Sequence, residues 1–406
     1  MTKVLIVGGG IGGLCLAHGL RADGIEVRVF ERTVRRTDWL QGYRIHINPD
    51  GAGALRACLP AANWKQFLAT VSDGDGGFSF LTPELRPLLE LSDDDVNAPD
   101  PDPARRHHGV SRIGLREALL AGLDEALEYG REFVRYEVAG GRVVAHFADG
   151  GTAEGDLLVG ADGANSRVRG QFLPAAERID TGVIAVAGKH WLTSEAGLPT
   201  TLTDRTNVVM PTGPGSLFTS SWSPSDPGAG GGYVLWGYSD AAQHLPVDGL
   251  DGAGLRDLIG RRIAGWHPLL RQLVAGSDPE TVNAVRVRSA PPRVAPWPTG
   301  PVTLLGDAIH SMTPMAGIGA NTALRDADLL RRMLAERALP DAVAAYEHRM
   351  REYGFAAVRL SLRNARMAAK ANPVGRYAFR AVLRTASVLP PLKRRMFADL
   401  GSSPND

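Results

Sequence analysis

Short apolar runs and a glycine cluster set the pattern of the first thirty-one residues. Residues 2–7 form a short, mainly apolar run that stops at a glycine, which predicts a buried strand. Apolar residues then recur at helical spacing from Ile11 to Leu20, and residues 26–30 return as a second strand. The pattern predicts a strand, a tight turn, a helix and a second strand.

The turn after the first strand carries the spacing Gly8-x-Gly10-x-x-Gly13. In a dinucleotide-binding loop the first glycine permits a tight turn, the second lets the backbone approach a pyrophosphate, and the third lets the helix pack on the strand. Unpaired N–H groups and the dipole at the helix N-terminus favour the anion. Glu31 ends the second strand, where an acidic side chain can accept hydrogen bonds from ribose hydroxyls. Because glycines, strands, helix and acid occur together, we predict a dinucleotide site.

Two later segments place basic side chains on predicted elements. An alternating stretch predicts a strand with Arg44 and His46 on one face. This face either looks toward the cofactor or belongs to a solvated edge strand. Ser111 suits the N-cap of a helix that we expect to run to about Leu127. Arg112 lies in its first turn, where the dipole disfavours a cation, so Arg112 either meets an anion or is a surface arginine.

The middle of the chain changes character twice. Residues 72–103 are rich in Asp, Gly and Pro, and their acidic run lacks the glycine and closing glutamate of a calcium loop. We therefore expect a solvated surface insertion. From about 178 to 289, short segments rich in Val, Thr, Tyr and Trp are broken by Gly and Pro, which predicts a mostly antiparallel sheet. We interpret this block as a second domain inserted into the first.

Two further buried strands end in acidic residues. One runs into Asp162, and the other runs into Gly306 and Asp307. Ligands bind at the carboxyl ends of parallel strands, so these acids are candidate site residues. Asn321 is expected to cap the helix that follows, and residues 341–406 are expected to be helical. Basic and apolar residues alternate near the end of the chain, which favours helices packed on the outside over a membrane or nucleic-acid contact.

Composition narrows the function classes. The 406 residues carry a formal net charge of +1 without a basic stripe interleaved with aromatic residues, so we expect no nucleic-acid partner. Cys15 and Cys58 belong to no paired motif, which favours reduced thiols and a reducing compartment. No apolar run is long enough to span a bilayer, and the N-terminus lacks a clear cleavage site. We expect a cytoplasmic protein without membrane insertion.

Three motifs stand in one order: Gly8-x-Gly10-x-x-Gly13 with Glu31, then Ala-Asp-Gly-Ala-Asn-Ser-Arg at 161–167, then Gly306-Asp307 followed by Pro314-x-x-Gly317-x-Gly319-x-Asn321. This set resembles the single-component FAD-dependent aromatic hydroxylases, the para-hydroxybenzoate hydroxylase family, over residues 1 to about 340. The resemblance implies an α/β fold with a Rossmann-like FAD-binding domain, an inserted, mostly antiparallel β-sheet substrate domain and C-terminal helices. The expected division is 1–177 for the first part of the FAD-binding domain, with a small substrate-side insertion near 60–105, then 178–290 for the substrate domain, 291–340 for the return of the FAD-binding domain, and 341–406 for the C-terminal helices.

The resemblance also implies which residues bind FAD. The strand position of Val134 is expected to meet adenine through its backbone, and Asp162 is linked to both FAD and NADPH. The segment from Pro314 to Asn321 is expected to pass along the flavin ring and to present a helix N-terminus to its N1–O2 edge. The full expected set is Gly8, Gly10, Ile11, Gly12, Gly13, Glu31, Arg32, Arg44, Arg112, Val134, Asp162, Gly306, Asp307, Pro314, Gly317, Gly319, Ala320 and Asn321.

In this family NADPH or NADH reduces the flavin, O2 adds to it, and the distal oxygen of the flavin hydroperoxide is transferred to an electron-rich ring. The resemblance implies a monooxygenase that hydroxylates an aromatic or polycyclic small molecule in this way, as a monomer or homodimer and without a metal. The nicotinamide cofactor is expected to bind transiently. The alternative is an FAD-dependent oxidoreductase that desaturates or reduces a lipid or polyketide without oxygen insertion.

The sequence points less clearly to the residues that act on the substrate than to those that bind FAD. His46 is a candidate catalytic base and Pro314 a candidate catalytic position, whereas His310 suits a structural role better. Met210, Trp222 and Trp236 are candidates for lining the substrate cavity, as is Trp191, although each also suits a plain core. Arg325 stands where many family members carry a small or polar residue, and its expected partner is either solvent or an acidic group.

Overall fold

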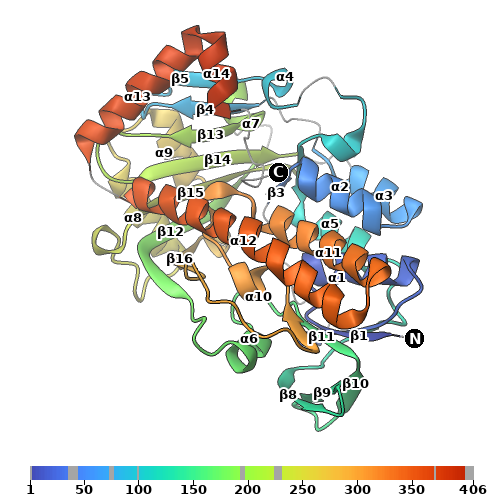
Figure 1. The fold of residues 1–406 in the computed structure, drawn as a ribbon. Helices are drawn as coiled ribbons and strands as arrows, with labels where there is room; N and C mark the ends of the chain where they lie inside the picture. The colour runs from blue at the N-terminus through green and yellow to red at the C-terminus, as the bar shows by residue number, and fades with distance from the viewer. Residues whose placement is uncertain are drawn as a thin grey trace.

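The computed structural model describes residues 2–34, 44–72, 77–97, 100–192, 197–223, 231–369 and 372–397. Its first layer is a five-stranded parallel sheet in the order β17-β11-β1-β2-β7 (Figure 1). These strands are β1 Lys3–Val7, β2 Glu26–Phe30, β7 Leu127–Glu128, β11 Leu157–Gly160 and β17 Val302–Leu304. Nearly all side chains of β1, β11 and β17 are buried, as expected for a parallel sheet covered on both faces.

Helices and a small sheet cover the two faces of this parallel sheet. The helices α1 Ile11–Ala22, α11 Gly319–Glu336 and α12 Leu339–Ala369 form one layer (Figure 1). Leu14, Leu16 and Leu20 are fully buried, which confirms the apolar helical face predicted for α1. The other face carries an antiparallel sheet of β8 Phe133–Ala139, β9 Arg142–Phe147 and β10 Thr152–Gly155. Gly155 lies so close to β1 that an added Cβ would stand 2.7 Å from the Leu5 side chain.

A seven-stranded sheet forms the second unit, in the order β16-β12-β15-β14-β13-β4-β5. Only the β13–β4 pair is parallel. The strands are β4 Phe78–Leu81, β5 Pro87–Leu91, β12 Ile179–Trp191, β13 Thr206–Val209, β14 Ser216–Trp222, β15 Tyr233–Ala241 and β16 Asn283–Ser289. The inserted antiparallel sheet was therefore predicted correctly, but the solvated insertion expected over 72–103 was wrong in part. Residues 78–91 supply two strands, and Leu88, Leu89 and Leu91 are buried.

Each face of the seven-stranded sheet has its own helical cover. The helices α8 Gly252–Arg262 and α9 Pro268–Ala275 bury Trp236, Tyr238 and Val186 against one face. The opposite face packs on α12 near β12 and β15, and on the C-terminal helices α13 Pro373–Val388 and α14 Pro390–Phe397 near β4 and β5 (Figure 1). Helices therefore cover both faces of this sheet.

A small antiparallel pair, β3 Arg44–Ile47 with β6 His108–Ser111, joins the two units, because both of its strands lie against β14. Asn48 caps α2 Pro49–Cys58 by accepting from the Gly51 amide, and α3 Ala61–Leu68 follows. Ser111 caps α5 Arg112–Leu120 through the Gly114 amide. The helix expected to continue to residue 127 ends at Leu120, because the chain turns at Gly122 (φ +78°) and pairs β7 with β2.

The remaining short elements complete the chain. They are the helices α4 Asp93–Val96, α6 Arg167–Phe172, α7 Thr200–Thr203 and α10 Asp307–His310, and the 3₁₀ turns at Pro103–Arg105, Ala242–His244, Pro279–Thr281 and Pro314–Ala316. Across the described ranges, the helices are too short or too polar to cross a membrane.

Candidate active site

Three loops meet at one edge of the parallel sheet. Val7 of β1 lies in register with Gly160 of β11, which in turn pairs with Leu304 of β17. Because the three strands are parallel, the residues that follow them emerge at the same edge, where ligands bind in α/β sheets. Gly8, Asp162 and the Gly306–Asp307 turn are therefore neighbours, although 299 positions separate Gly8 from Asp307.

The glycine loop has the shape of an anion cradle. Gly8 has φ +113°, and an added Cβ would stand 2.3 Å from the Ala161 carbonyl oxygen. A Cβ on Gly13 would stand 2.2 Å from the Gly8 carbonyl oxygen. At Gly10, by contrast, an added Cβ would stand 4.0 Å from the nearest atom, the Ala161 carbonyl oxygen, so this residue faces open space. Since α1 has neither a side-chain cap nor an acid in its first turn, its first N–H groups point into that space.

Glu31 fixes the far side of the cradle. Its carboxylate accepts from the Gly9 amide at 2.8 Å and from the Thr33 amide at 3.0 Å, and the residue is buried. Arg116 of α5 donates to the Gly9 carbonyl oxygen and ties the loop to a second helix. Arg116 was not predicted; it lies one helical turn after Arg112, a spacing that could have indicated it.

Two acids and two arginines surround the strand ends. The Asp162 Oδ2 atom accepts from the amides of Arg167 and Val168, and burial raises the pKa of this carboxyl. Desolvation also raises the pKa of Asp307, although solvent reaches this side chain, and His310, Arg112 and Arg178 oppose that rise. Arg112, in turn, is largely desolvated, and its pKa is lowered by burial and raised by Asp307. The structure thus brings Arg112 and Asp307 into electrostatic contact.

The polar groups of this arrangement fit FAD. The Asp162 Oδ1 atom is buried and has no hydrogen-bond partner in the described part of the chain. An oxygen in that state needs a donor, which a ribityl or ribose hydroxyl supplies. The open N-terminus of α1 at Gly10 and the cationic Arg112 suit a pyrophosphate.

The second helix N-terminus at the site belongs to α11. Gly317 has φ +66° and turns the chain into α11, and Gly319 lies 3.9 Å from Asp307 Oδ1, measured from the position of an added Cβ. Asn321 was expected to cap this helix, but it lies in the first turn. Its amide donates to the His46 carbonyl oxygen at 2.9 Å, and its carbonyl accepts from the Asn48 amide at 2.9 Å. Asn321 therefore fixes β3 to α11.

A buried cluster supports the Gly306–Asp307 turn from behind. Asp326 of α11 accepts from the Gly306 amide at 2.7 Å, from His310 Nε2 at 2.7 Å and from the Tyr353 hydroxyl at 2.5 Å. His310 is thus bonded within the protein, which agrees with the structural role favoured for it. The Arg325 guanidinium lies 4.2 Å from the centre of the Tyr353 ring and 3.9 Å from Asp50, so an acidic group is among its partners.

Side chains of β3 point from the cradle toward the seven-stranded sheet. Arg44 donates to Ser220 at 2.7 Å and to Thr206 at 3.3 Å, so its expected contact with FAD stays a prediction. The His46 Nε2 and His107 Nδ1 atoms are 2.9 Å apart, and the two rings are stacked. Arg44 and His46 share one face of β3, as predicted, and this face looks toward Ser220 rather than toward bulk solvent.

The candidate substrate residues divide between the two faces of the seven-stranded sheet. Trp236 is fully buried against α8 and α9 and donates to Ser277 at 2.6 Å, so the structure places it in the core. Trp222 lies two residues beyond Ser220, on the face toward β3, and stacks at an angle on Tyr233. Met210 packs with Phe78 and Phe80 under α13. Trp191 is exposed.

Other predicted residues lie at the margins. Val134 is exposed on β8, and Arg32 is exposed after β2. Their expected contacts with FAD stay predictions. No group of three or more His, Cys, Asp or Glu side chains suited to a metal occurs among the described residues.

Known proteins share these features. The FAD binding domain family matches residues 266–361, and the NAD(P)-binding Rossmann-like domain matches residues 6–45. A 3-amino-4-hydroxybenzoate 2-monooxygenase from Streptomyces cremeus is 32% identical over 354 residues, which cover 85% of this chain and 82% of that protein. The chain belongs to the family of FAD-dependent monooxygenases.

Further members of this monooxygenase family match over most of their length. A provisionally assigned FAD-containing monooxygenase from Photorhabdus luminescens subsp. laumondii TTO1 superposes with a TM-score of 0.81 at 39% identity, over 91% of this chain and 99% of that one. An FAD-dependent urate hydroxylase from Klebsiella oxytoca is 30% identical over 85% of both chains. The chain spans only 41% to 44% of three larger relatives, dual O-methyltransferase/FAD-dependent monooxygenases from Phaeosphaeria nodorum and two Cercospora species.

Proposed function

We propose that this monooxygenase uses NADPH or NADH and O2 to hydroxylate a small aromatic or polycyclic substrate. The observation that carries the proposal is the meeting of the FAD cradle with the N-terminus of α11 and with the β3 face of the seven-stranded sheet. When bound, FAD supplies hydride acceptance from the nicotinamide and the activation of O2. The relatives' names support an aromatic substrate, since they include hydroxybenzoate and urate hydroxylases.

The protein's own residues bind, orient and exclude water. Gly10, Arg112, Asp162 and Asp307 would hold FAD across the strand ends. The N–H groups of Gly319 and Ala320 at the start of α11 would stabilise negative charge on a flavin ring lying along Pro314. The substrate would lie between β3 and the sheet residues Thr206, Ser220 and Trp222, where Arg44 already holds the two units together.

His46 is proposed as the base that takes a proton from a phenolic or enolic substrate. Burial holds the pKa of His46 well below its usual value, and the neighbouring His107, Arg44 and His108 lower it further. The ring is therefore neutral near pH 7, which is the form of an imidazole that can accept a proton. His107 lies 2.9 Å behind it and would pass that proton toward solvent.

The proposal is tested by loading the protein with FAD and following NADPH and NADH oxidation while electron-rich aromatics are screened under air. A substrate should stimulate oxidation, and ¹⁸O from ¹⁸O2 should appear in the product. Stimulated oxidation that yields a product without label would overturn hydroxylation in favour of desaturation or reduction.

The role of His46 has a separate test. His46→Gln should reduce kcat by about 10²-fold or more if the residue is the base. His146→Gln is the matched control and should leave kcat unchanged, because His146 lies on β9 of the small antiparallel sheet, 3.7 Å from Glu137 of β8. Equal kcat values for the wild type and His46→Gln at all pH values would exclude His46 as the base and leave the hydroxylase proposal intact.

A further inference from the structure

The C-terminal part of the chain is strongly basic, although the whole protein is nearly neutral. Between Tyr353 and Phe397 the sequence holds ten Lys and Arg residues and no Asp or Glu. The full chain has 45 basic and 44 acidic residues, so the other residues comprise 35 basic and 44 acidic ones, a net charge of −9. The positive charge is therefore concentrated on the end of α12 and on α13 and α14.

Helix α13 has an apolar stripe on each side. The inner stripe includes Phe379, Leu383 and Ala386, which pack on the buried leucines of β5. The outer stripe lies opposite and contains Val374, Tyr377, Ala381 and Val388, whose positions i, i+3, i+7 and i+14 fall on one helical face. Val374 is 79% exposed, Tyr377 67% and Val388 74%. We call this outer stripe the α13 face. A soluble helix packed on one side normally turns polar residues outward, so an exposed stripe of this kind marks an interaction surface.

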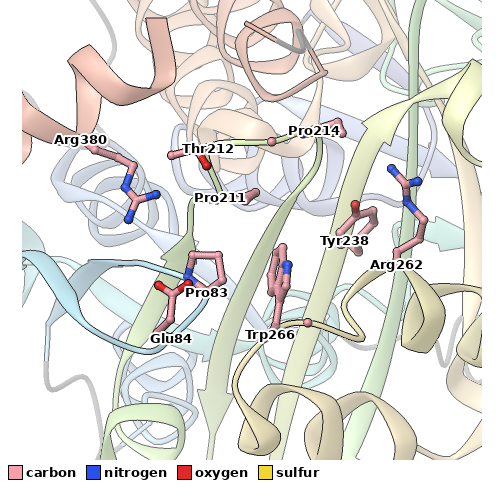
Figure 2. A pocket seen from close by; sticks show the side chains of 11 residues that line it. Pro83, Glu84, Pro211, Thr212, Pro214, Tyr238, Arg262, Trp266 and Arg380 are labelled. Atoms are coloured by element: carbon pink, nitrogen blue, oxygen red, sulfur yellow. The ribbon is translucent and has the colours of Figure 1, made fainter. Parts of the chain in front are cut away.

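Exposed arginines lie on α13 and on the helices that precede and follow it in the chain. Arg384 is exposed on α13, Arg395 is exposed on α14, and Arg363 and Arg366 are exposed near the end of α12. Other cations of this region are already engaged. Lys393 pairs with Asp95 at 2.6 Å, and Arg376 is buried, donating to the carbonyl oxygens of Gly213 and Gly215 at 2.6 Å. Arg380 lines a pocket of about 440 Å³ together with Glu84 and Trp266 (Figure 2).

The sequence pattern favours outer helices without a membrane contact at this end of the chain, but α13 leaves Val374, Tyr377 and Val388 exposed. We propose that the α13 face is a docking surface for an anionic lipid bilayer. Exposed valine and tyrosine side chains together with nearby arginines suit the boundary between acyl chains and acidic headgroups, where apolar burial and charge attraction both favour binding. The net negative charge of the remaining protein would be repelled from the same bilayer and would orient the molecule. The contact is peripheral, because the described helices are not membrane-spanning.

Two other occupants fit the charges less well. A second copy of the chain docked through the same face would bring two uncompensated basic segments together, which is unfavourable. A nucleic acid would match the arginines, but the stripe between them is aliphatic, with Tyr377 as its only ring, and offers no platform for stacking bases. The lipid surface satisfies both the charge and the apolar stripe.

The proposal also gives α13 a place beside the proposed substrate site. Phe379 contacts Phe80 of β4 on the sheet face that carries Phe218, which is 38% exposed. A chain docked through the α13 face would hold that sheet face close to the bilayer, where apolar aromatic compounds concentrate.

The test is flotation of the FAD-loaded full chain with phosphatidylcholine vesicles that contain or lack phosphatidylglycerol. The wild type should bind the anionic vesicles, and binding should fall as salt shortens the screening length from about 10 Å to about 3 Å. Replacing Val374, Tyr377 and Val388 together by Ser should weaken binding by about tenfold or more, because several buried methylene groups are lost. Arg384→Gln and Arg395→Gln should each weaken it by about fivefold.

Controls separate the α13 face from general surface effects. Val138→Ser with Val285→Ser removes two exposed valines from β8 and β16, which are 51% and 58% exposed, and should leave vesicle binding unchanged. The bound FAD and melting temperature of every variant should equal those of the wild type, because the substituted side chains are exposed. Absence of binding to anionic vesicles would overturn the proposal, as would equal binding to neutral vesicles. The proposal would also be overturned if the wild type forms a dimer that the triple substitution dissociates, or if the protein binds heparin but not vesicles. Either result would assign the α13 face to another occupant.

Discussion

Asp326→Asn tests the buried cluster behind the Gly306–Asp307 turn. The carboxylate accepts three hydrogen bonds, from Gly306, His310 and Tyr353, and neither Asp326 nor His310 has exposed side-chain surface. Asn keeps the size but removes the charge and turns one acceptor oxygen into a donor. Hydrogen bonds to a charged group contribute about 1.5–3 kcal/mol and neutral ones about 0.5–1.5 kcal/mol. Weakening three of them should lower the free energy of unfolding by about 3 kcal/mol.

Urea unfolding measures this loss, and a nearby residue supplies the control. Asp328 lies two positions further along α11 and pairs near the surface with Arg331 and Arg332. Surface ion pairs contribute at most about 1 kcal/mol, so Asp328→Asn should lower the free energy of unfolding by no more than that. If both substitutions lower the free energy of unfolding equally, the buried cluster stabilises the fold no more than a surface ion pair does.

His310 should make the contribution of the cluster depend on pH. Burial opposes its charge, but the charge of Asp326, the hydrogen bond to it and Asp307 raise the pKa of His310 above its usual value. A raised folded-state pKa means that this contribution is fully present below the unfolded value of about 6.5 and is lost as the pH rises through the folded value. The stability advantage of the wild type over His310→Gln should therefore be larger at about pH 6 than at about pH 9. An advantage that does not change between these values would refute the assignment.

Two further substitutions or reactions probe other parts of the chain. Gly8→Ala should abolish FAD retention, because the added Cβ would overlap the Ala161 carbonyl. The control Gly24→Ala, at φ +74° with open space around it, should lower the free energy of unfolding by about 1–2 kcal/mol and keep the flavin. Absorbance of bound flavin in a purified Gly8→Ala protein would contradict the proposed FAD cradle. Cys15 should resist thiol reagents in the folded protein, because its hydrogen bond with Cys58 and its burial raise the pKa of its thiol well above the usual value. Labelling of the protein in urea is the control. Rapid modification of the folded protein would show instead that the thiols are accessible.

Local patterns predicted most of the first domain. The glycine spacing, the apolar helical face and the acids after β2, β11 and β17 are each visible within a few neighbouring residues of the sequence, and the order of these segments is enough to predict the parallel sheet. The solvated insertion expected over 72–103 was partly wrong for the opposite reason. Residues 78–91 become strands because β4 pairs with β13, more than 120 positions later, where Ser79 faces Asn207. Neither segment shows that pairing by itself.

Asn321 illustrates the same limit at the candidate site. A polar residue after a glycine-rich loop is a normal helix cap, and from the sequence that role was reasonable. In the structure its side chain instead binds backbone groups of His46 and Asn48, 275 and 273 positions away. Gly51 leaves room for it, because an added Cβ there would stand 2.3 Å from the Asn321 side-chain oxygen. The contact joins two loops whose proximity only the fold creates.

Register decides which tryptophan faces the proposed substrate site. Side chains alternate along a strand, and directly paired residues of neighbouring strands share a face. Trp236 pairs with Thr219 of β14, and Thr219 is fully buried on the side of α8 and α9. Trp222 lies three positions after Thr219 and therefore points to the other face, with Ser220, which bonds Arg44. A shift of one residue in the β14–β15 pairing would exchange these two roles without changing the composition of either strand.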